Sequence, residues 1–120
     1  MKKRVLVIDD DRDIVELLKI VFRDSGHEVL FSQIALDLQE INVIHPDLVL
    51  LDVRIKGFSR TGADICKELK THPETKELPV ILCSGEYNLA EIARQCKANM
   101  YLPKPYDIMG LLFQVNKYLS

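Results

Sequence analysis

The segment Leu48–Asp52, with the sequence LVLLD, is an apolar run that ends in an acidic residue. An apolar run without polar alternation is typical of a strand covered on both faces, as in a parallel sheet. A second run of this kind, Val5-Leu6-Val7-Ile8, is followed by Asp9-Asp10-Asp11. We therefore predict a buried parallel sheet in which at least two strands end in acidic residues.

Segments with strand and helix patterns alternate along the whole chain around these two runs. Short apolar or β-branched runs predict strands at residues 4–8, 28–31, 48–51, 79–83 and 99–102. Apolar residues at helical spacing predict helices at residues 13–24, 34–41, 62–71, 89–97 and 107–119. This alternation indicates an α/β fold, with a parallel five-stranded sheet and helices on both faces. Ligands of such folds bind outside the carboxyl ends of the strands.

Length and composition narrow the class of protein. A chain of 120 residues, 48% hydrophobic and 28% charged, corresponds to one globular domain over residues 1–120. The net charge of −2 argues against direct nucleic acid binding by this domain. No apolar run reaches the ~20 residues of a membrane-spanning helix. The three cysteines lack CxxC spacing, so we expect free thiols and a cytoplasmic location.

Chemically reactive side chains follow four of the predicted strands. Asp9 and Asp10 follow the first strand, Asp52 the third, Ser84 the fourth and Lys104 the fifth. Because parallel strands end at one edge of a sheet, we expect these side chains to converge. Crowded carboxylates repel one another, and Mg²⁺, which prefers oxygen ligands, would relieve that repulsion. A carboxylate can also attack phosphorus, while a lysine and a hydroxyl stabilise the phosphoryl oxygens.

Taken alone, each of these residues has a simpler interpretation. An aspartate after a strand is often a helix N-cap, and we expect that role for Asp11. A single lysine such as Lys104 is usually a solvated surface residue. The combination of acids, hydroxyl and lysine at one edge favours a site for phosphoryl chemistry.

The sequence resembles the receiver domain of bacterial two-component response regulators. The resemblance covers the whole chain and rests on VLVIDDD at 5–11, PDLVLLD at 46–52, Ser84-Gly85 and YLPKPY at 101–106. It implies a (βα)5 flavodoxin-like three-layer sandwich. It also implies phosphorelay signal transduction, in which the protein becomes a phosphoprotein through an aspartyl phosphate and uses Mg²⁺ as its cofactor.

The resemblance assigns Asp52 as the phosphoacceptor and as one of the metal ligands. Asp10 would be a direct Mg²⁺ ligand, and Asp9 would act mostly through water. The backbone carbonyl of Arg54 would complete the protein's share of the coordination.

The resemblance also implies a switch. Ser84 would be the hydroxyl that moves toward the phosphoryl oxygens, and Tyr101 the aromatic residue that turns inward with it. Lys104 would pair with the phosphoryl group, and the Lys104–Pro105 bond is expected to be cis. Asp52, Ser84 and Lys104 are then the catalytic residues. The protein would not be a conventional enzyme, although it would assist its own phosphorylation and autodephosphorylation.

The expected phosphodonor is a sensor histidine kinase or a histidine phosphotransfer protein. In this family the fourth helix, fifth strand and fifth helix commonly form the surface that controls an output domain or partner, or that forms a homodimer. Met109 and Phe113 are i, i+4 neighbours off the main apolar stripe of the last helix. We expect them on that surface, with burial at the edge of the core as the alternative.

Two features depart from the family pattern or add to it. In residues 53–62, Lys56 stands where proline is common and the glycine comes about two residues late. The loop, with Lys56 and Arg60, is either a tolerated insertion or a segment that reads a partner or shields the phosphate. Arg54 and Glu86 are expected to flank the phosphoryl group, where they could pair over it and hinder the attacking water.

Three other classes of protein remain as alternatives. A haloacid-dehalogenase phosphatase would carry DxDx(T/V) after its first strand, but Asp9-Asp10-Asp11-Arg12-Asp13 lacks the final Thr or Val. A nucleotide-binding module would need a glycine-rich or hydroxyl-rich phosphate loop there. A degenerate receiver that only docks would not need the complete set of acids, serine and lysine.

Overall fold

Strands and helices alternate strictly in the computed structural model, which describes residues 2–55 and 61–120. The strands pair in parallel in the order β2-β1-β3-β4-β5. The parallel five-stranded sheet with helices on both faces is as predicted. The elements are β1 Arg4–Ile8, α1 Arg12–Phe22, β2 Glu28–Ser32, α2 Leu38–Ile44, β3 Leu48–Asp52, α3 Gly62–Thr71, β4 Val80–Ser84, α4 Leu89–Cys96, β5 Met100–Pro103 and α5 Ile108–Leu119.

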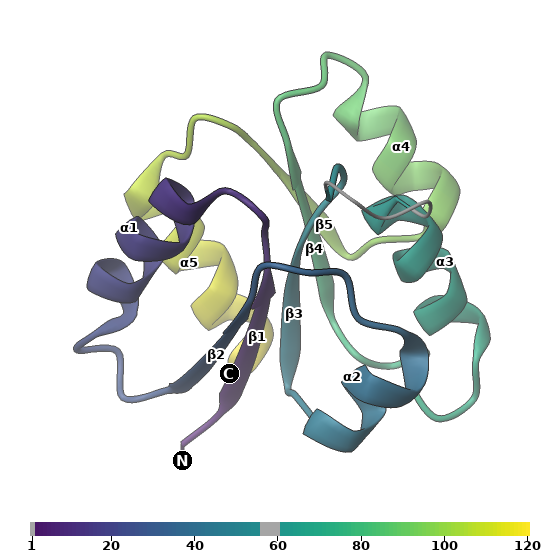
Figure 1. Ribbon diagram of the computed structural model, residues 1–120, viewed down its shortest axis with the longest axis horizontal. Helices are drawn as coiled ribbons and strands as arrows, with labels where there is room; N and C mark the ends of the chain where they lie inside the picture. Colours follow the sequence, from purple (N-terminus) through teal and green to yellow (C-terminus); the bar gives the residue numbers. More distant parts are fainter. Residues whose placement is uncertain (1, 56–60) are drawn as a thin grey trace.

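The sheet forms the middle of three layers (Figure 1). Helices α1 and α5 cover one face, and α2, α3 and α4 cover the other. Successive residues of β1 point to opposite faces, so Val5 and Val7 pack under α1 and α5 while Leu6 and Ile8 pack under the other three helices. All five residues of β3 are buried, as expected for a central strand covered on both faces.

The second helix differs most from its prediction. Residues 34–41 were expected to be helical, but α2 begins at Leu38 and continues to Ile44. Asp37 and Glu40 form a capping box that fixes its start. Ile34 lies before the helix and is 68% exposed. His45 ends the helix in the left-handed conformation.

Gly62 joins the start of α3 to the end of β3. Its backbone N–H donates to the carbonyl oxygen of Val53 at 2.7 Å. A Cβ at this position would lie 1.9 Å from the carbonyl oxygen of Asp52, so no other residue fits without a shift of the backbone. The loop prediction for Lys56 and Arg60 lies outside the described residues. Among the described helices, none is long and apolar enough to cross a membrane.

Candidate functional site

The reactive side chains predicted from the sequence meet at the carboxyl edge of the sheet. Strands β1, β3, β4 and β5 are direct neighbours. Asp52 is the last residue of β3, and Ser84 is the last residue of β4. Asp9 directly follows β1, and Lys104 directly follows β5. The parallel pairing thus brings together residues that are up to 95 positions apart in the chain.

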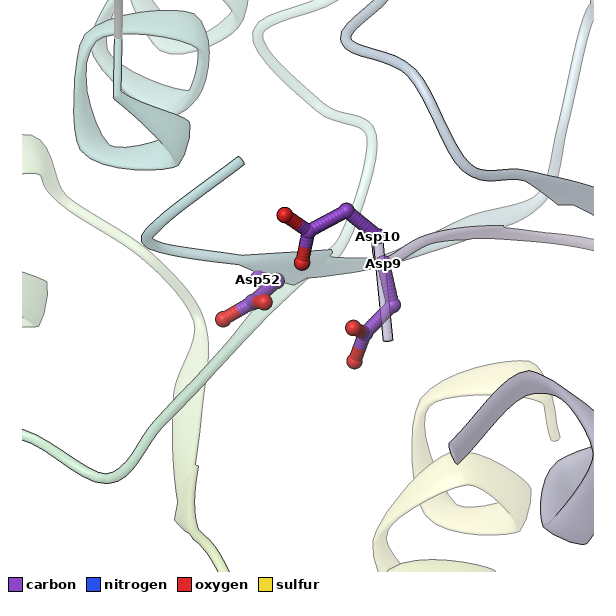
Figure 2. A group of neighbouring side chains, drawn as sticks. All are labelled: Asp9, Asp10 and Asp52. Carbon is purple, nitrogen blue, oxygen red and sulfur yellow. The ribbon is translucent and has the colours of Figure 1, made fainter. Parts of the chain in front are cut away.

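Three carboxylates form the acidic part of this site (Figure 2). Asp9, Asp10 and Asp52 each offer one oxygen, and these oxygens lie within 4.8 Å of one another. Asp9 and Asp52 are buried, being 2% and 7% exposed, and Asp10 is partly exposed. The backbone N–H of Asp11 donates to Asp9 Oδ1 at 2.9 Å and fixes that carboxylate. This donor set fits a hard divalent cation such as Mg²⁺.

Lys104 reaches into the acidic cluster from the other side. Its Nζ lies 2.8 Å from Asp9 Oδ2 and 3.3 Å from Asp52 Oδ2. Burial alone would lower the pKa of Lys104, but the hydrogen bond to Asp9 and the charge of Asp52 outweigh it and raise the pKa. The lysine is therefore cationic at neutral pH. The peptide bond that follows it, Lys104–Pro105, is cis as expected.

One lysine does not compensate the buried negative charge. Burial and the charge of Asp9 raise the pKa of Asp52 from 3.8 to about 6, although Lys104 lowers it. The backbone N–H of Arg54 also donates to the Asp52 carboxylate and lowers its pKa. The edge of the sheet thus carries more negative charge than Lys104 neutralises. A bound cation would reduce the repulsion between the carboxylates.

Ser84 and the two loops beside it complete the site. Its side chain is buried, and Oγ accepts a hydrogen bond from the backbone N–H of Glu86 at 2.9 Å. A cleft of about 1190 Å³ opens over Asp52, Ser84 and Lys104, between residues of α3 and α4. The side chains of Arg54 and Glu86 form an ion pair at this cleft, so the pairing considered from the sequence is present.

The other residues singled out in the sequence lie at the start of α1, on β5 and on α5. Asp11 is the N-cap of α1, as predicted, and accepts from the backbone N–H groups of Asp13 and Ile14. Tyr101 lies on β5 and is 41% exposed. Met109 and Phe113 are 76% and 66% exposed, so they are surface residues of α5 and not part of the core edge.

Sequence reasoning missed three features of the site. The first is the hydrogen bond from the backbone N–H of Arg54 to the Asp52 carboxylate. It does not involve the Arg54 side chain, so the residue type at position 54 gives no indication of it. The packing of Gly62 against β3 was detectable only as a displaced glycine in the loop. Tyr106 forms a hydrogen bond with the thiol of Cys83, and burial raises the pKa of the tyrosine. Burial likewise raises the pKa of Cys83 to about 12.

A family model for the response regulator receiver domain matches residues 5–116. The chain therefore belongs to this family, the receiver domains of two-component response regulators. It is 32% identical to the sporulation initiation phosphotransferase F of Bacillus subtilis over 99% of this chain and 95% of that protein. It is 28% identical to the DNA-binding response regulator MtrA of Mycobacterium leprae, over 99% of this chain and 52% of that protein. The chain thus spans about half the length of the MtrA relatives.

Solved structures agree with this assignment. A crystal structure of a putative response regulator from Chloroflexus aurantiacus has a TM-score of 0.87 and 30% identity, covering 99% of this chain and 98% of that one. The receiver domain of NtrX from Brucella abortus has a TM-score of 0.78 and 31% identity, covering 96% and 97% of the two chains. Vibrio cholerae CheY4, at 22% identity and a TM-score of 0.80 over 98% and 99% of the chains, shares the fold. The family match favours a receiver over the phosphatase and nucleotide-binding alternatives.

Proposed function

We propose that this receiver, as a domain over residues 1–120, accepts a phosphoryl group on Asp52. The phosphodonor is a sensor histidine kinase or a histidine phosphotransfer protein of the same bacterial cytoplasm. The observation that carries the proposal is the placement of Asp52 between two further carboxylates and the Nζ of Lys104, which lies 3.3 Å away. Few structural roles require three acids, a lysine and a buried hydroxyl at one edge of a sheet.

The metal in this proposal is Mg²⁺. Asp10 and Asp52 would hold it directly, together with the backbone carbonyl of Arg54, and Asp9 would act through water. When bound, the ion neutralises negative charge on the phosphoryl oxygens. The raised pKa of Asp52, caused mainly by burial and then by Asp9, supports a need for such a cation.

Phosphorylation needs one nucleophile and few other groups. A carboxylate oxygen of Asp52 forms a bond to phosphorus while the bond from phosphorus to the donor nitrogen breaks, and the imidazole keeps that electron pair. Lys104 is already cationic between Asp9 and Asp52, so it can shift its contact to a phosphoryl oxygen without a change of protonation. In hydrolysis, water attacks the same phosphorus and the bond from phosphorus to the Asp52 oxygen breaks, which gives inorganic phosphate and the Asp52 carboxylate.

Ser84 is the proposed switch residue. Its hydroxyl now accepts from the Glu86 amide, and its O–H can donate to a phosphoryl oxygen if the loop moves toward Asp52. Only four residues separate Ser84 from α4, so this movement would reach the helix. Tyr101, which is exposed on the neighbouring β5, would turn inward as the loop leaves its present position.

The proposed output surface consists of α4, β5 and α5. Tyr101, Met109 and Phe113 expose apolar area there, which is typical of a contact surface. We propose that this surface controls an output domain or a partner, or forms a homodimer. The net charge of −2 supports a domain that does not itself bind nucleic acid.

Beryllofluoride, which mimics a phosphoryl group, tests the site without a kinase. In the presence of Mg²⁺, we expect it to shift the amide NMR signals of Asp52, Ser84 and Lys104 in the wild type. The Asp52→Asn variant should show no such shifts. Identical spectra of wild type with and without beryllofluoride would favour the alternative of a degenerate docking domain.

A further inference from the structure

The thiols of Cys66 and Cys96 meet between α3 and α4. Cys66 lies in the middle of α3, and Cys96 is the last residue of α4. The thiol of Cys96 lies 3.6 Å from the carbonyl oxygen of Ala93 in its own helix. The thiol of Cys66 lies 3.5 Å from the carbonyl oxygen of Cys96. That carbonyl belongs to the last turn of a helix, where backbone acceptors lack partners within the helix.

Both sulfurs lie in an apolar environment next to the functional cleft. Cys66 is fully buried and Cys96 is 4% exposed, and both belong to the core that contains Ile65 and Leu69. Cys96 also lines the cleft over the carboxyl edge of the sheet. Of the two residues, Cys96 is therefore the one that an oxidant in the cleft would meet first, and Cys66 is the more deeply buried.

The positions of the two thiols distinguish them. Cys96 lines the cleft, whereas Cys66 is fully buried behind it. The interaction with Cys66 lowers the pKa of Cys96 although burial opposes it, and burial adds to the interaction that raises the pKa of Cys66. Cys96 is thus placed to be the attacking sulfur and Cys66 the resolving thiol.

We propose that Cys66 and Cys96 are a redox-active pair that forms an intramolecular disulfide and so ties α4 to α3. The oxidant is a small peroxide. The Cys96 thiolate attacks one peroxide oxygen, which gives a sulfenic acid and releases the other oxygen as water after protonation. The Cys66 sulfur then attacks the sulfenic sulfur, and the hydroxyl leaves with the Cys66 proton as a second water. Two thiols are oxidised and one peroxide is reduced to two waters.

The bond would act on the walls of the cleft. Residues Ala63, Asp64 and Lys67 of α3 line one side, and Ile92, Gln95 and Cys96 of α4 line the other. Because α4 ends at Cys96 and begins four residues after Ser84, the bond would limit any movement of α4 that starts from the Ser84 loop. Reduction by a thiol would release it.

Hydrogen peroxide and the intact chain test this proposal. After oxidation, the protein is denatured, its free thiols are alkylated, and peptides are mapped by mass spectrometry. We expect a cross-linked peptide pair containing Cys66 and Cys96, and alkylation at Cys83 only. Cys83 is the internal control, because it lies in the other core cluster and burial raises its pKa to about 12. Dithiothreitol should restore three alkylated thiols.

Two further measurements separate this bond from general oxidation damage. Cys66→Ala should give a Cys96 sulfenic or sulfinic acid and no cross-link within the chain. In the wild type, oxidation should raise the urea midpoint of unfolding and slow amide hydrogen exchange in residues 85–96. Alkylation of Cys66 and Cys96 to the same extent as Cys83, or cross-links between chains only, would overturn the proposal.

Discussion

Replacing Asp52 by Asn should stabilise the metal-free protein at neutral pH. Burial and the charge of Asp9 raise the pKa of Asp52 from 3.8 to about 6 in the fold, so the folded state prefers the protonated acid. The stability that this preference provides is complete below pH 4 and is lost as the pH rises through about 6. One pKa unit corresponds to about 1.4 kcal/mol, so the ionised Asp52 destabilises the fold by about 3 kcal/mol at pH 7.

The Asp52→Asn variant removes this charge but keeps the shape and one acceptor oxygen. Lys104 retains its 2.8 Å contact with Asp9, so the lysine stays paired. We expect a gain of about 2 to 3 kcal/mol in the free energy of unfolding at pH 7, which falls toward zero below pH 4. Urea unfolding in EDTA, followed by far-UV circular dichroism from pH 4 to 8, measures this gain. For a domain of this size it corresponds to a rise of roughly 8 to 15 °C in the melting temperature.

Mg²⁺ should reduce the difference in stability between the two proteins. A ligand that binds only the folded state stabilises it by an amount that grows with the logarithm of the ligand concentration relative to Kd. The variant lacks one of the proposed metal ligands. Added Mg²⁺ should therefore raise the urea midpoint of the wild type more than that of Asp52→Asn. A variant that is less stable at pH 7 in EDTA, or a gain that does not change between pH 4 and pH 7, would refute the reasoning from burial and charge.

The remaining predictions concern the ion pair at the cleft, the α4-β5-α5 surface and the junction between β3 and α3. The Arg54→Asn, Glu86→Ala double variant should lose its phosphoryl group faster than the wild type, because the ion pair no longer shields phosphorus from water. Acrylamide gels that retard phosphoproteins follow the loss. Equal or slower dephosphorylation would contradict this prediction. Phe113→Glu should weaken phosphorylation-dependent association in analytical ultracentrifugation. Ile20→Glu, at a residue of α1 that is 60% exposed, is the matched control outside the α4-β5-α5 surface. Gly62→Ala should lower the free energy of unfolding by about 3 kcal/mol, because overpacking against the Asp52 carbonyl forces the backbone to shift; an unchanged urea midpoint would show that the junction between β3 and α3 can relax.

The strands and the reactive residues could be predicted because both are local in the sequence. Apolar runs such as Leu48–Asp52 define buried strands, and the acid at the end of the run then has only one edge of the sheet to occupy. The predicted start of α2 was wrong because the prediction followed the spacing of apolar residues and not the polar residues that cap the helix. Asp37 and Glu40 have the capping-box spacing that marks the true start.

The features that were missed depend on the path of the backbone or on contacts between segments. The bond from the Arg54 amide to Asp52 depends on the path of the backbone after β3. The meeting of Cys66 and Cys96 depends on how α3 packs against α4, and spacing in the sequence gives no indication of it. The family pattern could place Arg54 and Glu86 near one another, but their ion pair is visible only in the structure.

Intact-mass spectrometry after incubation with acetyl phosphate tests the central claim most directly. The account predicts that the wild type gains the mass of one phosphoryl group in the presence of Mg²⁺, and that neither EDTA-treated wild type nor Asp52→Asn does so. Asp47→Asn is the matched control, because Asp47 lies before β3 at the opposite edge of the sheet, and it should be phosphorylated like the wild type. An adduct that persists in Asp52→Asn, or no adduct in the wild type with Mg²⁺, would contradict the assignment of Asp52 as the phosphoacceptor.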